Sequence, residues 1–286
     1  MSVAAAVLLF REGLEAALIV AIVLGYLRRL GQGDRRGSVL AGVGLAVALT
    51  LGFSIALQLL GAAFDYPAKG IYEGLTSLAA VVMLTGMVFW MTRQARHIKG
   101  SLERGVDAAL AGGGSLALFS LVFFSVAREG LETGLFLSAA AFASSGAAIV
   151  VGGLVGLAAA IGAAWLMYHV GVRLDLRTFF RVTSVLLIVF GAAILRYAVH
   201  EFEEVNLLPP LVERVWSTGH YLPDGTGLGA ILSALVGYTS KPSLMQLLAY
   251  VGYLVGVGAA ATYLSRPAPT PMVQATTPQG RMARAR

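Results

Sequence analysis

Long apolar stretches separated by short, basic loops make up most of the chain. An α-helix needs about 20 apolar residues to cross a bilayer, and a window of that length predicts seven membrane-spanning helices. They cover residues 3–27, 37–60, 71–90, 115–142, 147–169, 182–199 and 244–264. The hydropathy pattern therefore predicts an all-α integral membrane protein.

Two segments depart from this pattern. Residues 227–237 read GLGAILSALVG, which is apolar but too short to cross a bilayer, so we expect a re-entrant or interfacial helix there. The tail, residues 267–286, is rich in Pro, Thr, Gln and Arg and offers little to bury, which predicts disorder. The membrane domain is thus expected to occupy residues 1–266.

The basic residues predict the orientation of the chain. They gather after the first, third and fifth spans and in the tail, whereas the alternate loops hold few. The basic loops contain Arg28, Arg29, Arg35 and Arg36, then Arg93, Arg96, Lys99 and Arg104, then Arg173, Arg177 and Arg181. Because Lys- and Arg-rich loops stay in the cytoplasm, we expect the N-terminus outside and the C-terminal tail in the cytoplasm.

Composition agrees with a membrane protein and narrows its chemistry. Of the 286 residues, 57% are hydrophobic and 13% are charged, with a net charge of +6, whereas soluble domains carry about 25% charged residues. The chain has no cysteine, which excludes disulfides and thiolate metal sites. We expect membrane lipid as a partner and no nucleic acid, and the sequence leaves homo-oligomerisation open.

Two of the expected spans carry the same charged word, REGLE, at residues 11–15 and 128–132. Its charged members are Arg11, Glu12 and Glu15 in the first copy and Arg128, Glu129 and Glu132 in the second. At about 100° per residue, the three charges of each word lie on one helix face. The small residues beside them, Gly13 and Gly130, allow another helix to come close.

The position of the two words predicts an inverted repeat. Three spans separate them, so their helices cross the bilayer in opposite directions. The chain then divides into three plus three spans, about residues 1–92 and about residues 115–199, followed by a seventh helix. Because inverted repeats place their binding site where the halves meet, near the bilayer midplane, we expect the two charged faces to meet there.

The charges at such a site predict a bound cation. Four carboxylates would confront two guanidiniums, and each ion at mid-bilayer costs at least about 2.5 to 3.5 kcal/mol. Carboxylate oxygens are hard ligands that suit calcium, magnesium, manganese and ferric iron, and they do not by themselves separate these ions or protons. The alternative is structural: each Arg pairs with the Glu four residues on, and the four ions only hold the two helices together. Two glutamates for every arginine argue against it.

The paired REGLE words resemble the oxidase-dependent high-affinity iron permease family, which includes fungal iron permeases and bacterial relatives. YEGL at 72–75, HEFEE at 200–204 and GYTSKPSLMQLLAYVGY at 237–253 support the resemblance. It implies that the protein is a transporter of the plasma membrane, or cell inner membrane, that moves iron, expected as Fe(III), into the cytoplasm. By resemblance the four REGLE glutamates are the ligands, and Arg11 and Arg128 orient them.

The same resemblance predicts no permanent cofactor, and it implies a separate ferroxidase or extracytoplasmic iron-delivery protein as partner. Charged residues at the outer ends of the third and sixth spans predict a metal-recruiting vestibule, with solvated helix ends as the alternative. They are Glu73, His200, Glu201 and Glu204.

Three other functions remain open at this stage. The same ligands would serve a permease for another hard or borderline cation, such as manganese or lead. Glu-x-x-Glu on two helices is also similar to di-metal carboxylate enzymes, although these add a Glu-x-x-His word, and neither charged span holds a histidine. A scaffold subunit would need no excess of glutamate.

Overall fold

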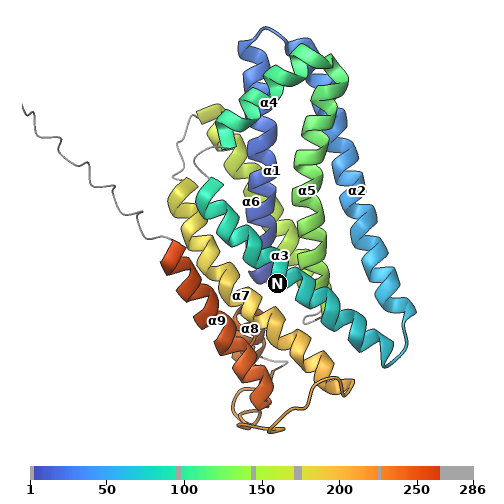
Figure 1. Cartoon of the computed structure of the whole chain (residues 1–286), viewed down its shortest axis with the longest axis vertical. Helices are drawn as coiled ribbons and strands as arrows, with labels where there is room; N and C mark the ends of the chain where they lie inside the picture. The colour runs from blue at the N-terminus through green and yellow to red at the C-terminus, as the bar shows by residue number, and fades with distance from the viewer. Residues whose placement is uncertain (1–2, 95–97, 143–145, 171–175, 225–226, 265–286) are drawn as a thin grey trace, which may run out of the picture.

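The computed structural model describes residues 3–94, 98–142, 146–170, 176–224 and 227–264, and over these residues it contains helices and no strands (Figure 1). The helices are α1 (Val3–Arg29), η1 (Gly33–Arg35), α2 (Arg36–Ala63), α3 (Ala68–Gln94), α4 (Ile98–Gly112), α5 (Gly114–Phe142), α6 (Gly146–Val170), α7 (Leu176–Glu204), α8 (Gly227–Val236) and α9 (Leu244–Leu264). The all-α prediction is confirmed for the described residues. The tail at 267–286 lies outside them.

Within the described residues, six helical segments are long and apolar enough to cross a membrane. They lie at Gly33–Ala63, Ala68–Trp90, Gly114–Phe142, Gly146–Leu166, Val182–Glu204 and Leu244–Ala261. α1 has the length to cross, with 27 residues at about 1.5 Å each, but three charges interrupt its apolar stretch. The membrane-helical character is thus supported, while the seventh crossing and the orientation stay predictions.

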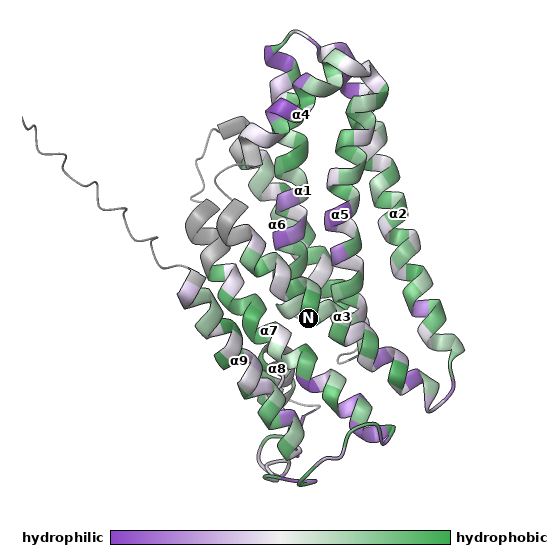
Figure 2. Cartoon of the chain, viewed as in Figure 1, coloured by the Kyte–Doolittle hydropathy of each residue, from purple (hydrophilic) through white to green (hydrophobic). Residues whose placement is uncertain are grey.

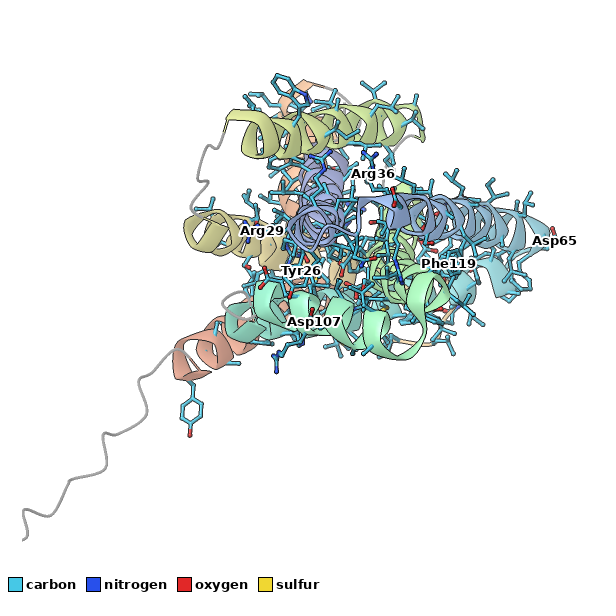
Figure 3. All side chains as sticks on the ribbon, turned by 90° about the horizontal axis from the view of Figure 1, so that it is seen from above. Tyr26, Arg29, Arg36, Asp65, Asp107 and Phe119 are labelled. Carbon is cyan, nitrogen blue, oxygen red and sulfur yellow. The ribbon has the colours of Figure 1, made fainter. Side chains whose placement is uncertain are left out.

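α4 is a helix that the hydropathy window missed, because its apolar residues form only a stripe. Val106 and Ala109 are buried against α5 in one apolar cluster. Next to Val106, Asp107 accepts at both carboxylate oxygens from the Tyr26 hydroxyl of α1, at 2.9 and 3.0 Å (Figure 3). α4 therefore covers the end of the bundle where α1 ends and α5 begins.

The long helices pack in pairs that mirror one another. α1 packs along α6, α5 packs along α2, and α3 packs along α7, while α1 and α5 also meet each other. Close approach is possible because of small residues: a Cβ built on Gly13 would lie 3.1 Å from Ala160 Cβ of α6, and one on Gly130 would overlap the Thr50 hydroxyl of α2. The prediction that another helix approaches at these glycines is confirmed.

α1 and α5 run in opposite directions, with a polar layer between two apolar clusters. Leu8 near the start of α1 belongs to the same cluster as Phe136 near the end of α5. Val23 near the end of α1 shares the other cluster with Leu118 near the start of α5. Figure 2 shows the hydrophilic turns of both helices between these apolar regions. The fold thus isolates the charged words inside the bundle.

The segments before and after α8 are held together by hydrogen bonds. Beyond its C-terminal end, the Ser240 amide and hydroxyl donate to the two Asp224 carboxylate oxygens before it, at 2.6 and 2.8 Å. Gly237, which follows α8 with φ of 69°, packs directly on Ala193 in α7. Asp224 and Ser240 therefore close the base of a loop that contains α8 and packs against α7. Its re-entrant placement in the bilayer stays a prediction.

Candidate metal site

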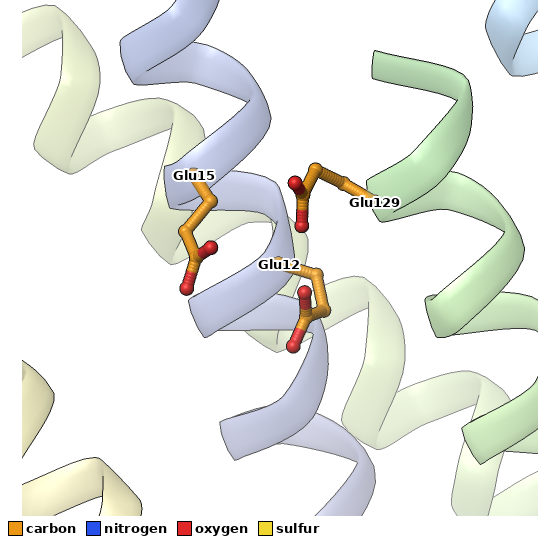
Figure 4. A group of neighbouring side chains, drawn as sticks. All are labelled: Glu12, Glu15 and Glu129. Atoms are coloured by element: carbon orange, nitrogen blue, oxygen red, sulfur yellow. The ribbon is translucent and has the colours of Figure 1, made fainter. Parts of the chain in front are cut away.

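The antiparallel packing of α1 and α5 brings carboxylates from the two charged words together. Glu12, Glu15 and Glu129 are all buried, and each offers one ligand oxygen within 4.8 Å of the others. Figure 4 shows the α1 glutamates and Glu129 of α5 facing one another. Within the described residues this is the one group of three or more carboxylate or histidine ligands that is close enough to hold a metal ion.

Each word also forms the ion pair four residues apart that the structural alternative expects. Arg11 Nε lies 3.3 Å from Glu15 Oε1, and Arg128 Nε donates to Glu132 Oε1 at 3.0 Å. Arg11 Nη1 additionally lies 3.4 Å from Glu12 Oε1. Since two arginines face four glutamates, ion pairing leaves two negative charges uncompensated. The structural alternative, in which these ion pairs are the whole purpose of the charged words, therefore does not account for the site.

The two arginines differ in their surroundings. The Arg11 side chain is 0% exposed, whereas the Arg128 side chain is 45% exposed. Arg11 Nη1 donates to Met87 Sδ at 2.8 Å, and the Arg128 guanidinium lies over the Trp90 ring, 4.4 Å from its centroid. Met87 and Trp90 both belong to α3. Neither contact has a signal in the sequence, because an apolar residue within an apolar span fits the expected pattern.

Several charged atoms at this site have no hydrogen-bond partner in the described part of the chain. They are Glu12 Oε2, Glu15 Oε1, Glu132 Oε2, Arg11 Nε and Arg11 Nη2. Arg11 Nε and Glu15 Oε1 still form an ion pair with each other. Burying a charged atom without a hydrogen bond is costly, so Glu12 Oε2 and Glu132 Oε2 favour a cation as their ligand. The donors are carboxylate oxygens only, which suits hard and borderline cations. The group contains no histidine, unlike the di-iron sites of helical bundles.

Glu132, the fourth predicted ligand, is not one of the three glutamates whose oxygens lie within 4.8 Å of one another. One of its oxygens accepts from Arg128 and the other is buried without a partner. The structure thus brings three of the four predicted glutamates into ligand distance of one another.

The predicted outer vestibule divides into two groups. Glu73 Oε2 accepts from the Tyr197 hydroxyl at 2.6 Å, and Glu201 also interacts with Tyr197. In the second group, His200 Nε2 lies 3.3 Å from Glu204 Oε1, and the His200 ring contacts the Tyr197 ring with 6.5 Å between their centroids. The second pair lines a pocket of about 280 Å³. Among the described residues, neither group brings three metal ligands together.

The pocket contains an acidic residue that sequence reasoning missed. Glu203 accepts from the Ser243 hydroxyl at 2.6 Å and from Gln246 Nε2 at 2.7 Å. The Gln246 backbone N–H donates to Ser243 Oγ at 3.1 Å, so Ser243 caps the start of α9. The sequence signal for this cap was a serine three residues before Gln246 at the start of the helix, whereas the contacts of Glu203 had no such signal. These hydrogen bonds join the end of α7 to the start of α9.

Comparison with known proteins identifies relatives of this chain. The Iron permease FTR1 family matches residues 2–266. The ferrous iron permease EfeU of Shigella sonnei is 37% identical over 250 residues, which cover 87% of this chain and 91% of that protein. EfeU of Yersinia pestis is 35% identical over 250 residues, covering 87% and 89%. No solved structure matches the chain.

These relatives are named as permeases, which are transporters rather than enzymes. The match extends over both charged words and all of the helices that could cross a membrane. The resemblance drawn from the REGLE words is thereby confirmed: the chain is a multi-pass membrane protein and belongs to the Iron permease FTR1 family.

Proposed function

We propose that the protein is an iron permease of the plasma membrane and moves iron into the cytoplasm through the carboxylate cluster between α1 and α5. The observation that carries this proposal is the convergence of Glu12, Glu15 and Glu129, buried and within 4.8 Å of one another. Iron would exchange its hydration shell for these oxygens. Arg11 and Arg128 would hold Glu15 and Glu132 in place and compensate half of the negative charge.

Alternating access within an inverted repeat is the mechanism that the packing supports. If α1, α2 and α3 correspond to α5, α6 and α7, then the α1–α6 and α5–α2 contacts are equivalent, and α1–α5 and α3–α7 are contacts between corresponding helices. The cluster lies where the two halves meet, as expected of such transporters. The buried Arg11 and the half-exposed Arg128 support a state in which the cluster opens toward one side only.

The charge of the cluster bears on the oxidation state of iron. Four glutamates and two arginines leave a formal charge of minus two, which one divalent cation neutralises, and the relatives are named ferrous iron permeases. Ferric iron, expected from the resemblance of the sequence and suited to hard oxygen ligands, stays a prediction. Uptake measurements with each form of iron distinguish the two.

Radiolabelled iron uptake into proteoliposomes tests the function. We expect saturable uptake that protein-free liposomes lack, and the comparison of ascorbate-reduced iron with ferric citrate identifies the transported form. Excess unlabelled iron should compete fully, and manganese or zinc only weakly. Uptake of manganese in preference to iron would instead support the alternative of a permease for another hard or borderline cation.

The orientation gives a second testable prediction. Gly33→Cys, at the start of η1, is expected on the cytoplasmic side, and Gly146→Cys, at the start of α6, outside. A Cβ at either glycine meets no other atom within 4 Å, and the chain has no other cysteine. An impermeant thiol reagent should label position 146 in intact cells and position 33 only after permeabilisation. The opposite labelling pattern would show that the chain crosses the membrane in the orientation opposite to the predicted one.

The pocket beside α7 and α9 is the proposed place of iron entry. His200 and Glu204 can offer two ligands there to an arriving ion, and Glu73 and Glu201 add negative charge on the neighbouring face. We propose that a separate ferroxidase or extracytoplasmic iron-delivery protein presents iron at this end. This proposal depends on the predicted orientation, which places the end of α7 outside.

A further inference from the structure

We infer that α3 positions the guanidiniums of both charged words, through Met87 for Arg11 and Trp90 for Arg128, and thereby keeps carboxylate oxygens available for the cation. Both α3 residues are positioning residues, since neither belongs to the carboxylate cluster. This inference rests on the proposed function, because it assigns these residues a role in binding the transported ion.

The contact between Arg11 and Met87 is the shortest that the Arg11 guanidinium makes among those described. Nη1 lies 2.8 Å from Met87 Sδ, against 3.4 Å to Glu12 Oε1 and 3.3 Å from Nε to Glu15 Oε1. Met87 is 4% exposed. A thioether is a weak, neutral acceptor, so a guanidinium held by it is kept from the short bidentate pairing with a carboxylate that arginine otherwise favours.

Trp90 plays the corresponding part at the second word. The Arg128 guanidinium carbon lies 4.4 Å from the centroid of the indole ring, within the range of a favourable cation–π contact. Arg128 Nε donates to Glu132 Oε1 at the same time. Because the ring face stabilises the cation without using a carboxylate lone pair, Glu129 stays free of an ion pair within the described residues.

The two contacts come from one turn of one helix. Residues three apart lie on the same side of a helix, so Met87 and Trp90 can reach the two arginines together. When the Thr-Ser pairs of α3 and α7 at 76–77 and 183–184 are superimposed, the corresponding positions on α7 are Ile194 and Tyr197. Ile194 has no acceptor, and Tyr197 donates to Glu73 instead. Both arginines are therefore held from the α3 side.

A pair of substitutions at Met87 separates positioning from packing. Met87→Leu keeps the volume and removes the acceptor, so Arg11 is expected to close on Glu12 and Glu15 and to raise the KM for iron about fivefold. The maximal rate should change much less. Met87→Gln supplies an amide oxygen of similar reach and should restore the KM toward that of the unmodified protein. A packing role predicts the reverse order, because Leu replaces buried Met well and a buried amide does not.

A second, independent pair of substitutions, at Trp90, keeps the inference testable if Met87→Gln fails to fold. Trp90→Phe retains an aromatic face and should have a lower KM than Trp90→Leu. All variants are compared with the unmodified protein in proteoliposomes, and iron binding to each purified, monodisperse protein is measured by equilibrium dialysis.

The outcomes separate the inference from the proposed function. Iron binding and uptake by the unmodified protein, with Leu equal to or better than Gln at position 87 or better than Phe at position 90, would overturn the role of α3 and leave the proposed function intact. If the unmodified protein neither binds nor transports iron, the proposed function fails and the inference fails with it.

Discussion

Glu12→Gln is expected to reduce iron uptake at least about 100-fold while the protein still inserts in the membrane. Glu12 is 2% exposed, and its carboxylate is one of the three that converge. An amide removes a negative charge and leaves one neutral oxygen donor, and even partners outside the ligand shell typically cost 10- to 100-fold in metal affinity when mutated. Insertion should not suffer, because the substitution removes a charge from the bilayer. Radiolabelled uptake per amount of membrane-inserted protein measures the effect.

Matched substitutions define the expected pattern. Glu15→Gln and Glu129→Gln should be as severe as Glu12→Gln, since all three carboxylates belong to the converging group. Glu132→Gln should retain more uptake, because Glu132 is paired with Arg128 outside that group. Glu103→Gln on α4 makes the same chemical change away from the site and should be neutral. Normal uptake by the three Gln variants of the converging group would leave the charged words with an interhelical role only.

Hydropathy predicted the long helices well, because a helix that crosses a bilayer must be continuously apolar. Residues 147–169 were predicted for the fifth span, and α6 covers Gly146–Val170. The same rule missed α4, which buries only a stripe that includes Val106. It did predict a helix at residues 3–27 in spite of three charges, and α1 (Val3–Arg29) forms there and packs within the bundle.

The carboxylate cluster was predictable because two identical charged words in helices of opposite direction leave few arrangements that bury both. The sequence could not reveal which oxygens converge, since this depends on the offset between α1 and α5. Glu12, Glu15 and Glu129 converge within 4.8 Å, and Glu132 is not part of that group. The contacts of Met87 and Trp90 were also hidden, because an uncharged acceptor and an aromatic face have no pattern in an apolar span.

The vestibule shows a further limit of sequence reasoning. Its four residues were grouped by their position along the chain, yet Glu73 accepts from Tyr197 whereas His200 and Glu204 pair with each other. Adjacent residues such as His200 and Glu201 differ by about 100° around a helix. Only the packing of α3 and α9 against α7 decides which of them share a pocket.

Gly130→Ala is expected to lower iron uptake at least about tenfold by displacing the second charged word. A Cβ on Gly130 would overlap Thr50 Oγ1 and lie 3.0 Å from Thr50 Cβ, and the Thr50 hydroxyl is held by a 2.9 Å hydrogen bond to the Ala46 carbonyl. α5 must then move away from α2, carrying Glu129 with it. Metal ligands tolerate only about 0.2 Å, so a shift of this kind disrupts binding before it disrupts insertion.

A second substitution on α2 separates this displacement from a general effect on folding. Thr50→Gly removes the three atoms nearest to the new Cβ, which all belong to the Thr50 side chain, so the double variant Gly130→Ala with Thr50→Gly should recover most of the uptake, although glycine within a helix costs about 1 kcal/mol. Gly52→Ala is the matched control, since a Cβ there meets nothing within 4 Å, and it should be neutral. Full activity of Gly130→Ala alone, or no recovery in the double variant, would mean that the α2–α5 contact does not set the position of Glu129, because the geometry requires that relieving the contact return the carboxylate to its partners on α1.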